Sequence, residues 1–249
     1  MGDLVLREDH GGVVHLVLNR PEKLNSLNVA VFEDLERHVS ALETAPGSAR
    51  VVVLRGAGRC FSAGHDLGDL AAGEQLPRPN FQAEVIERIA NLPLPVITAV
   101  HGHCYTGALE LALAGDLIVA AEGARFADTH ARWSLTPIWG LSQRLPRRVG
   151  AHRAREMMFT CRTYDGRAAE AMGLANECVP DGELDAAVAA LAAEIAANSG
   201  FSHAANKRLL LATDGMAIGD GLAHEIFRGE GFGPDMDERI AAFAARRNG

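Results

Sequence analysis

Hydrophobic positions in the first hundred residues fall into short β-prone runs. Runs at 4–6 and 13–18 flank the turn-forming residues 9–12, Asp-His-Gly-Gly, and this pattern predicts a β-hairpin. Continuous β-branched runs at 51–54 and 96–100 are typical of strands that are covered on both faces. A glycine-bearing segment follows each of these two runs, and a functional site is expected there.

Apolar residues at helical spacing alternate with these runs. The series from Phe32 to Leu42 predicts an amphipathic helix that begins near Asn28, a residue suited to an N-cap. Helices are also expected at 81–89 and from 107 to 114, followed by a strand at 117–121. This alternation of strands and helices predicts an α/β fold.

The remaining segments predict a loop at the rim of the functional site and a helical C-terminal part. The Gly- and Pro-rich stretch 68–79 predicts a surface loop that could gate substrate entry. The pattern becomes helical from residue 151 onward, and no sharp linker divides the two regions. Helices are expected there at 153–159, 166–172, 184–197, 207–211 and 237–247.

Composition narrows the class of protein. The 249 residues are 48% hydrophobic and 22% charged, which is typical of a globular chain and excludes disorder and fibrous repeats. Lys and Arg number 24 against 32 Asp and Glu, so the net charge of −8 provides no basic field for nucleic acid or anionic lipid. We therefore expect neither nucleic acid nor a membrane as a partner.

Targeting and cysteine patterns indicate a reducing compartment. No run approaches the roughly 20 apolar residues of a membrane span, and the N-terminus lacks the pattern of a signal peptide. The four cysteines are scattered without a C-x-x-C spacing, which argues against a disulfide framework or a thiolate metal cage. His101 and His103 would share one face of a strand, but no third ligand stands at a useful spacing. We expect a cytoplasmic protein without a metal site.

The two glycine-bearing segments carry a resemblance to a known family. Residues 60–67, Cys-Phe-Ser-Ala-Gly-His-Asp-Leu, resemble the A-G-x-D-[LI] signature of the crotonase (enoyl-CoA hydratase/isomerase) superfamily. Residues 101–110 resemble its second oxyanion segment, in which a glycine precedes an acid by three residues at a helix start. Residues 20–27 match the family element R-P-x-x-x-N-[AS]-L. Such matches cover almost the whole chain in the family order.

The resemblance implies both a fold and a ligand. It implies a crotonase-like ββα spiral core over residues 1–190 and a helical C-terminal oligomerisation region over residues 191–249. Members of the superfamily usually form homotrimers or dimers of trimers and bind an acyl-CoA thioester. The resemblance implies no metal or redox cofactor, because the oxyanion hole and the side chains supply the electrophilic and proton-transfer roles, and coenzyme A is part of the substrate.

By family position, the oxyanion donors are the backbone N–H groups of His65 and Gly107. A thioester enolate needs two convergent N–H donors, and glycine allows the chain to approach closely at a helix N-terminus. The resemblance also assigns a coenzyme A-binding strip that acts largely through backbone contacts. Its residues are Lys23, Leu24, Ser26, Ala63, Asp66 and Leu67.

Acid-base chemistry is expected from Glu110 and His130. Hydratases of the family hold and split water with two glutamates, and Glu110 falls on the first. Ungapped alignment places His130 on the second, with Asp128 as the nearest carboxylate. A histidine with an ordinary pKa near 6.5 can still exchange a proton. We expect a lyase that adds water to a 2-enoyl-CoA, or an isomerase of that thioester.

Several alternatives remain open. His65 stands where hydratases usually have alanine, and decarboxylase and hydrolase branches direct such a histidine at the acyl group, although Pro137 replaces the tyrosine of one decarboxylase pattern. A non-catalytic acyl-CoA-binding protein is a further alternative. Glu110 could merely favour the helix dipole, and His130 could be a solvated loop residue. Trp139 would narrow the cavity and favour a short acyl group if its side chain points inward.

Overall fold

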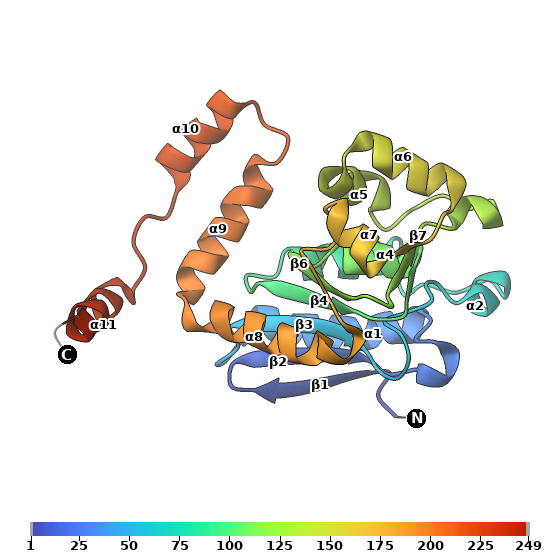
Figure 1. The fold of residues 1–249 in the computed structure, drawn as a ribbon, viewed down its shortest axis with the longest axis horizontal. Coiled ribbons are helices and arrows are strands. Elements are labelled where there is room, and N and C mark those ends of the chain that lie inside the picture. Colours follow the sequence, from blue (N-terminus) through green and yellow to red (C-terminus); the bar gives the residue numbers. More distant parts are fainter. Residues whose placement is uncertain (1, 248–249) are drawn as a thin grey trace.

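The computed structural model describes residues 2–247 and contains two β-sheets (Figure 1). The larger sheet has six strands in the order β1-β2-β3-β4-β6-β9, parallel except for the antiparallel β1–β2 hairpin. The smaller sheet has the order β5-β7-β8. Strands of the larger sheet are β1 Val5–His10, β2 Val13–Leu18, β3 Val51–Gly56, β4 Val96–Val100, β6 Leu117–Ala121 and β9 Glu177–Val179. Strands of the smaller sheet are β5 His103–Tyr105, β7 Arg125–Ala127 and β8 Tyr164–Asp165.

Helices cover the sheets and continue into the C-terminal part. The helices of the core are α1 Val29–Thr44, α2 Leu67–Ala71, α3 Phe81–Ala90, α4 Gly107–Ala112, α5 Leu141–Val149, α6 Ala151–Thr160, α7 Gly166–Ala171 and α8 Leu184–Ala197. The C-terminal helices are α9 Gly200–Thr213, α10 Ile218–Arg228 and α11 Met236–Arg247. Short 3-10 helices lie at Pro21–Lys23, His130–Trp133 and Asp181–Glu183.

After β3, the chain passes twice from a strand of the larger sheet to a strand of the smaller sheet. Strand β4 of the larger sheet is followed by β5 of the smaller sheet and then by α4. Strand β6 is followed in the same way by β7. After β3, an isolated parallel bridge between Ser62 and Cys104 extends the smaller sheet by one position before α2 begins. This repeated ββα order is the spiral arrangement expected from the sequence.

Strands β3 and β4 are buried on both faces, which confirms the expectation from the β-branched runs. Val52 and Val100 pack with α1, α3 and α4 in the larger apolar cluster. Val53 and Ile97 point to the opposite face, where Val188 of α8 covers them. Because β3 and β4 are fixed from both sides, the segments that follow them start from rigid positions.

The expectation of a loop over 68–79 was wrong at its start. Residues 67–71 form α2, because the Asp66 carboxylate accepts hydrogen bonds from the N–H groups of Gly68 and Asp69 at its N-terminus. Helix α5 was also missed, since only Leu141 and Leu145 are buried among polar neighbours and Pro146 lies inside the helix. Strands of two or three residues, such as β8 and β9, are too short to produce a readable pattern.

The last three helices extend away from the sheets (Figure 1). Helix α8 packs on the larger sheet and contains residue 190, the expected boundary between the two regions. Lys207 ties α9 to the core through Asp116 at 2.7 Å and the Leu94 carbonyl at 3.2 Å. Within residues 2–247 no single helix is long and apolar enough to cross a membrane. Helices α8 and α9 reach that length only together, across a bend of 100°.

Candidate active site

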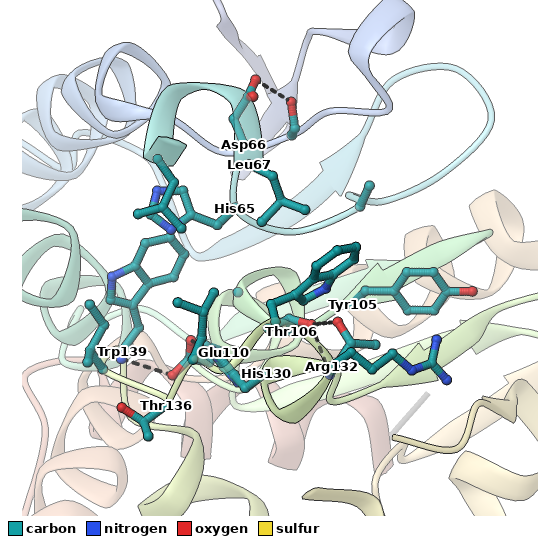
Figure 2. Close-up of a pocket in the computed structure, with 18 of the residues that line it drawn as sticks. His65, Asp66, Leu67, Tyr105, Thr106, Glu110, His130, Arg132, Thr136 and Trp139 are labelled. Atoms are coloured by element: carbon teal, nitrogen blue, oxygen red, sulfur yellow. Dashed lines mark hydrogen bonds and ion pairs between the residues drawn. The ribbon is translucent and has the colours of Figure 1, made fainter. Parts of the chain in front are cut away.

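One cavity of about 580 Å³ collects most of the residues singled out in the sequence (Figure 2). It lies where the segments after β3 and β4 meet the segment after β7. Its lining includes eight of the expected site residues, namely Glu110, His130, His65, Gly107, Ser26, Ala63, Asp66 and Leu67. Lys23 and Leu24 lie outside the lining. The Leu24 carbonyl accepts a hydrogen bond of 2.9 Å from the N–H of Ala63 and so supports the cavity wall.

Two backbone N–H groups lie close together at one wall of the cavity. A Cβ placed on Gly107 would be 3.3 Å from the His65 nitrogen, and one on Gly64 would be 3.6 Å from the Gly107 nitrogen. Gly64 has a φ of +100°, and a side chain there would lie 2.5 Å from the Tyr105 carbonyl oxygen. Within residues 2–247, neither the His65 N–H nor the Gly107 N–H donates a hydrogen bond. Both donors are therefore available to a ligand.

Glu110 is a buried carboxylate that is bonded on one side only. It lies in the first turn of α4 with 1% of its surface exposed. Its Oε1 accepts hydrogen bonds from the N–H groups of Trp139 at 2.9 Å and Leu141 at 3.2 Å. Burial raises the pKa of Glu110, and the two N–H groups and His130 only partly oppose this effect. Oε2 is left to meet a ligand or a proton.

His130 faces that second oxygen and is held from behind by Asp128. The His130 Nε2 lies 3.7 Å from the Glu110 Oε2, a separation that a bound water or substrate atom can bridge. The His130 Nδ1 lies 2.6 Å from the Asp128 Oδ1, which also accepts the His130 backbone N–H at 3.1 Å. Asp128 is 1% exposed. The bond fixes the ring with Nδ1 protonated and Nε2 turned to the cavity.

Asp128 was named in the sequence only as the nearest carboxylate, and its contact with His130 was not foreseen. The two residues are separated by one position where β7 ends and the 3-10 helix begins. An Asp-x-His spacing is the only signal that the sequence offers for this contact. A turn between them was needed to bring the two side chains together, and β7 has only three residues.

The His65 side chain is engaged by a residue of the rim. Its Nε2 lies 2.9 Å from the Glu74 Oε2, which also accepts a hydrogen bond of 2.9 Å from the Gln82 side chain. The Glu74 Oε1 accepts the N–H of Val29 at the start of α1. The centroid of the His65 ring lies 4.8 Å from that of the Trp139 ring. Glu74 lies in the stretch expected as a surface loop, where no pattern marked it.

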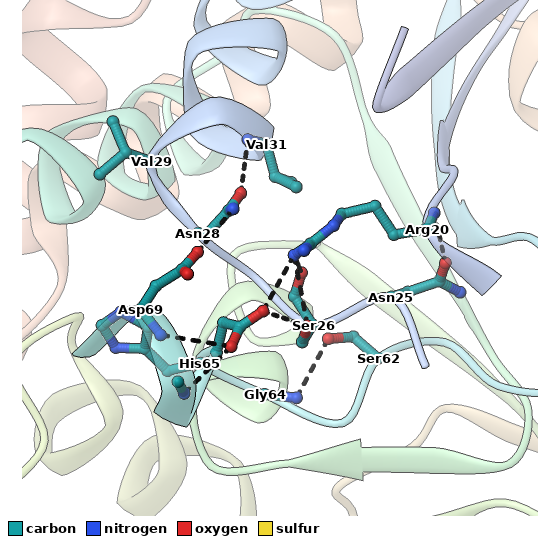
Figure 3. A network of polar contacts seen from close by, with 12 residues as sticks. Arg20, Asn25, Ser26, Asn28, Val29, Val31, Ser62, Gly64, His65 and Asp69 are labelled. Atoms are coloured by element: carbon teal, nitrogen blue, oxygen red, sulfur yellow. Dashed lines mark hydrogen bonds and ion pairs between the residues drawn. The ribbon is translucent and has the colours of Figure 1, made fainter. Parts of the chain in front are cut away.

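Ser26 and Asp66 of the expected coenzyme A strip bond to each other, and Figure 3 shows the polar network around Arg20 and Ser26. The Ser26 hydroxyl donates to the Asp66 Oδ2 at 2.9 Å, and the Arg20 guanidinium lies 3.3 Å from the same oxygen. Burial alone would raise the pKa of Asp66, but these bonds, the N–H groups of α2 and the Arg20 charge lower it. This network holds the segment from Ala63 to Leu67 against the N-terminal element.

The cysteines and histidines singled out in the sequence are also candidate nucleophiles and metal ligands. Burial raises the pKa of the thiols of Cys60 and Cys104, so both are poor nucleophiles. His101 bonds to the Gly58 carbonyl, and the His103 ring packs on Tyr105. In the part of the chain that the structure describes, no three His, Cys, Asp or Glu residues are arranged to hold a metal ion.

The chain is similar in sequence and in fold to known proteins. The family model "Enoyl-CoA hydratase/isomerase" matches residues 8–225. A Rhodobacter capsulatus protein named "Probable enoyl-CoA hydratase" is 36% identical over 242 residues, 95% of this chain and 93% of that protein. The solved structure of an enoyl-CoA hydratase from Mycobacterium tuberculosis is 31% identical with a TM-score of 0.90, covering 98% of this chain and 97% of that one.

A second solved structure gives the same result. The enoyl-CoA hydratase from Bacillus anthracis is 31% identical with a TM-score of 0.89, and the match covers 98% of this chain and 96% of that one. Both likenesses include the helical C-terminal part. The expected fold, a crotonase-like spiral with a helical extension, is thereby confirmed.

Proposed function

The chain is an enzyme of the enoyl-CoA hydratase/isomerase family, and from that premise we propose that it adds water to a 2-enoyl-CoA thioester. The observation that carries the proposal is the pair formed by the Glu110 Oε2 and the His130 Nε2, 3.7 Å apart. Both residues line the cavity that is also lined by His65 and Gly107, whose backbone N–H groups donate no hydrogen bond within residues 2–247. An acceptor, a donor and an anion-stabilising pair are thus available around one substrate.

The two backbone N–H groups hold the thioester carbonyl oxygen in this proposal. As water adds to Cβ, negative charge develops on that oxygen, and two fixed N–H donors stabilise the enolate without reorganisation. One such donor is worth roughly 3–4 kcal/mol in a transition state. Burial in the cavity strengthens both bonds because competing water is excluded.

Glu110 and His130 divide the proton transfers. His130, with its Nδ1 proton held by Asp128, accepts a proton from water at Nε2 while the water oxygen bonds to Cβ. Glu110, favoured in its protonated form by burial, gives the proton on Oε2 to Cα. The proton taken up by His130 then returns to Glu110, which restores both groups. No metal or redox cofactor takes part in this scheme.

The proposal is tested with crotonyl-CoA and the purified protein. Loss of the enoyl-thioester absorbance is followed for the wild type and for the Glu110→Gln and His130→Ala variants. We expect both substitutions to lower kcat by roughly 10² to 10⁴, the usual contribution of a general acid or base. A wild type that leaves crotonyl-CoA unchanged, or a Glu110→Gln variant with full activity, would contradict the proposal.

Four alternative functions would use the same class of ligand, an acyl-CoA thioester. An isomerase would move the double bond of the thioester without taking up water. A decarboxylase or thioester hydrolase would use the His65 ring, whose Nε2 already bonds to Glu74, and would release carbon dioxide or free coenzyme A. A non-catalytic acyl-CoA-binding protein would bind tightly and show no turnover. We propose a cytoplasmic location for any of these functions, in keeping with the scattered cysteines.

A further inference from the structure

We propose that Trp139 forms the end wall of the acyl site and restricts this enzyme to short acyl groups. This inference rests on the proposed acyl-CoA chemistry and adds the substrate class. The Trp139 side chain points inward, with 3% of the residue exposed, and it lines the cavity that contains Glu110 and His130. Figure 2 shows the indole between His65 and Glu110.

The indole lies directly beside the reacting groups. A Cβ placed on Gly107 would be 2.5 Å from the Trp139 Cζ3, so the indole is in contact with the residue that supplies one oxyanion donor. The Trp139 backbone N–H bonds to the Glu110 Oε1, which fixes the wall next to the proposed acid. An acyl chain whose carbonyl lies at the His65 and Gly107 N–H groups and whose Cα lies at Glu110 therefore meets the indole after few carbons.

Neighbouring rings hold the indole in place. Phe32 of α1 contacts it edge-on, with the ring centroids 5.0 Å apart and the planes at 68°. His65 lies 4.8 Å away on another side, and Glu74 fixes the His65 ring in turn. A side chain packed between two rings does not move aside without losing both contacts. The wall is consequently a fixed limit on chain length.

A second hollow of about 860 Å³ continues beyond this wall. Ile138 and Trp139 line both cavities, so they form the partition between them. On the far side the hollow is bordered by apolar residues such as Ala83 and Leu113 together with charged residues of α3 and α5. We expect removal of the indole to join the two spaces and to give a longer acyl chain a path out of the active site.

The other of the two tryptophans in the chain, Trp133, provides a matched control for substitution of Trp139. Trp133 lines the active-site cavity, is 55% exposed and does not border the second hollow. Its removal takes away the same indole from the same cavity but leaves the partition intact. Trp133→Ala is therefore expected to change the binding of short and long acyl-CoA to a similar extent.

The test measures binding of butyryl-CoA and decanoyl-CoA by calorimetry, because these saturated thioesters cannot be hydrated. We expect the wild type to prefer butyryl-CoA, and Trp139→Ala to lower the ratio of the decanoyl to the butyryl Kd at least tenfold. Trp133→Ala should leave that ratio within about twofold. Trp139→Leu, which keeps an apolar side chain in the packed site, should lower it at least threefold and serves if the alanine variant does not fold.

The outcomes separate this inference from the function on which it rests. If the wild type binds butyryl-CoA but neither Trp139 variant changes the ratio, or if the wild type prefers decanoyl-CoA, the assignment of the wall is overturned and the acyl-CoA chemistry stands. If the wild type binds neither thioester, the proposed function is overturned and the inference falls with it.

Discussion

At the scale of single residues, the site depends on the different surroundings of the two carboxylate oxygens of Glu110. Oε1 of Glu110 accepts two backbone N–H groups, whereas Oε2 has His130 3.7 Å away. The two oxygens are chemically identical in the free side chain, so this division is imposed by Trp139 and Leu141. Burial then raises the pKa of the group, and a proton on Oε2 becomes the form suited to donation.

The raised pKa of Glu110 has a consequence for stability. Burial makes the ionised form costly in the folded state, so wild-type stability falls as pH rises through the folded pKa. Glu110→Gln remains neutral at every pH and can still accept both N–H groups. We expect its Tm advantage over the wild type to be small near pH 4.5, the ordinary pKa of this carboxyl, and to increase as the pH rises above it. A thermal series at several pH values measures it, and an advantage that shrinks with rising pH would contradict the raised pKa.

Asp128 is expected to act by positioning His130. Asp128→Asn keeps the size of the side chain but lets the imidazole lose the tautomer with Nε2 free. We expect kcat for crotonyl-CoA to fall at least tenfold, with a KM within about threefold of the wild type. Because a purely structural defect would also lower the Tm, the thermal midpoint is measured in parallel. An unchanged kcat in Asp128→Asn would contradict a positioning role for Asp128.

The family resemblance predicted that His65, Gly107, Glu110 and His130 meet in one site, but the contacts of Asp128 and Glu74 were not predicted. His65, Gly107 and Glu110 follow buried strands, and their convergence follows from the order of those strands. The contacts of Asp128 and Glu74 depend on a 3-10 turn and on an irregular rim. Neither segment has an apolar period from which its conformation could be predicted.

At the scale of elements, α2 illustrates how one carboxylate can hold a helix of five residues. Asp66 caps α2 through Oδ1 and bonds to Ser26 and Arg20 through Oδ2. Such a short helix has little stability of its own in water. The cap therefore determines whether the segment after His65 is helix or loop, and the Gly-rich composition alone could not reveal it.

Substitution of Asp66 separates the cap from the charge. Asp66→Ala loses both, and we expect the free energy of unfolding to fall by about 1–2 kcal/mol, mostly from the lost cap. Asp66→Asn keeps an oxygen that can cap the helix and loses the Oδ2 contacts with Ser26 and Arg20, so it should lose less than Asp66→Ala. Urea denaturation measures both values. Equal losses in the two variants would show that the cap contributes nothing.

At the scale of the whole molecule, the spiral core buries its apolar residues, whereas the C-terminal helices leave many of theirs exposed. Figure 1 shows α10 and α11 away from both sheets. Large apolar residues on this extension are exposed, by 82% at Ile218, 80% at Phe227 and 83% at Phe232. A monomer rarely exposes so many large apolar side chains together. We propose that they meet other copies of the chain in a homotrimer or a dimer of trimers.

The proposed assembly is tested by size-exclusion chromatography with light scattering. The wild type is expected to elute with the mass of three or six chains. The double variant Ile226→Asp with Phe227→Asp should shift towards the monomer, since it places charges on α10 residues that are 70% and 80% exposed. Phe159→Asp alters a phenylalanine of α6 that is 76% exposed and lies away from the extension, and it should leave the mass unchanged. A monomeric wild type would contradict the assembly.

The most direct test of the central claim follows the oxygen of water. Crotonyl-CoA is incubated with the wild type and with Glu110→Gln in water enriched in ¹⁸O, and the products are identified by mass spectrometry. We expect the wild type to form 3-hydroxybutyryl-CoA that carries the label in its hydroxyl group, and Glu110→Gln to form far less. Labelled free crotonate with released coenzyme A, or the absence of any labelled thioester, would contradict hydration by Glu110 and His130.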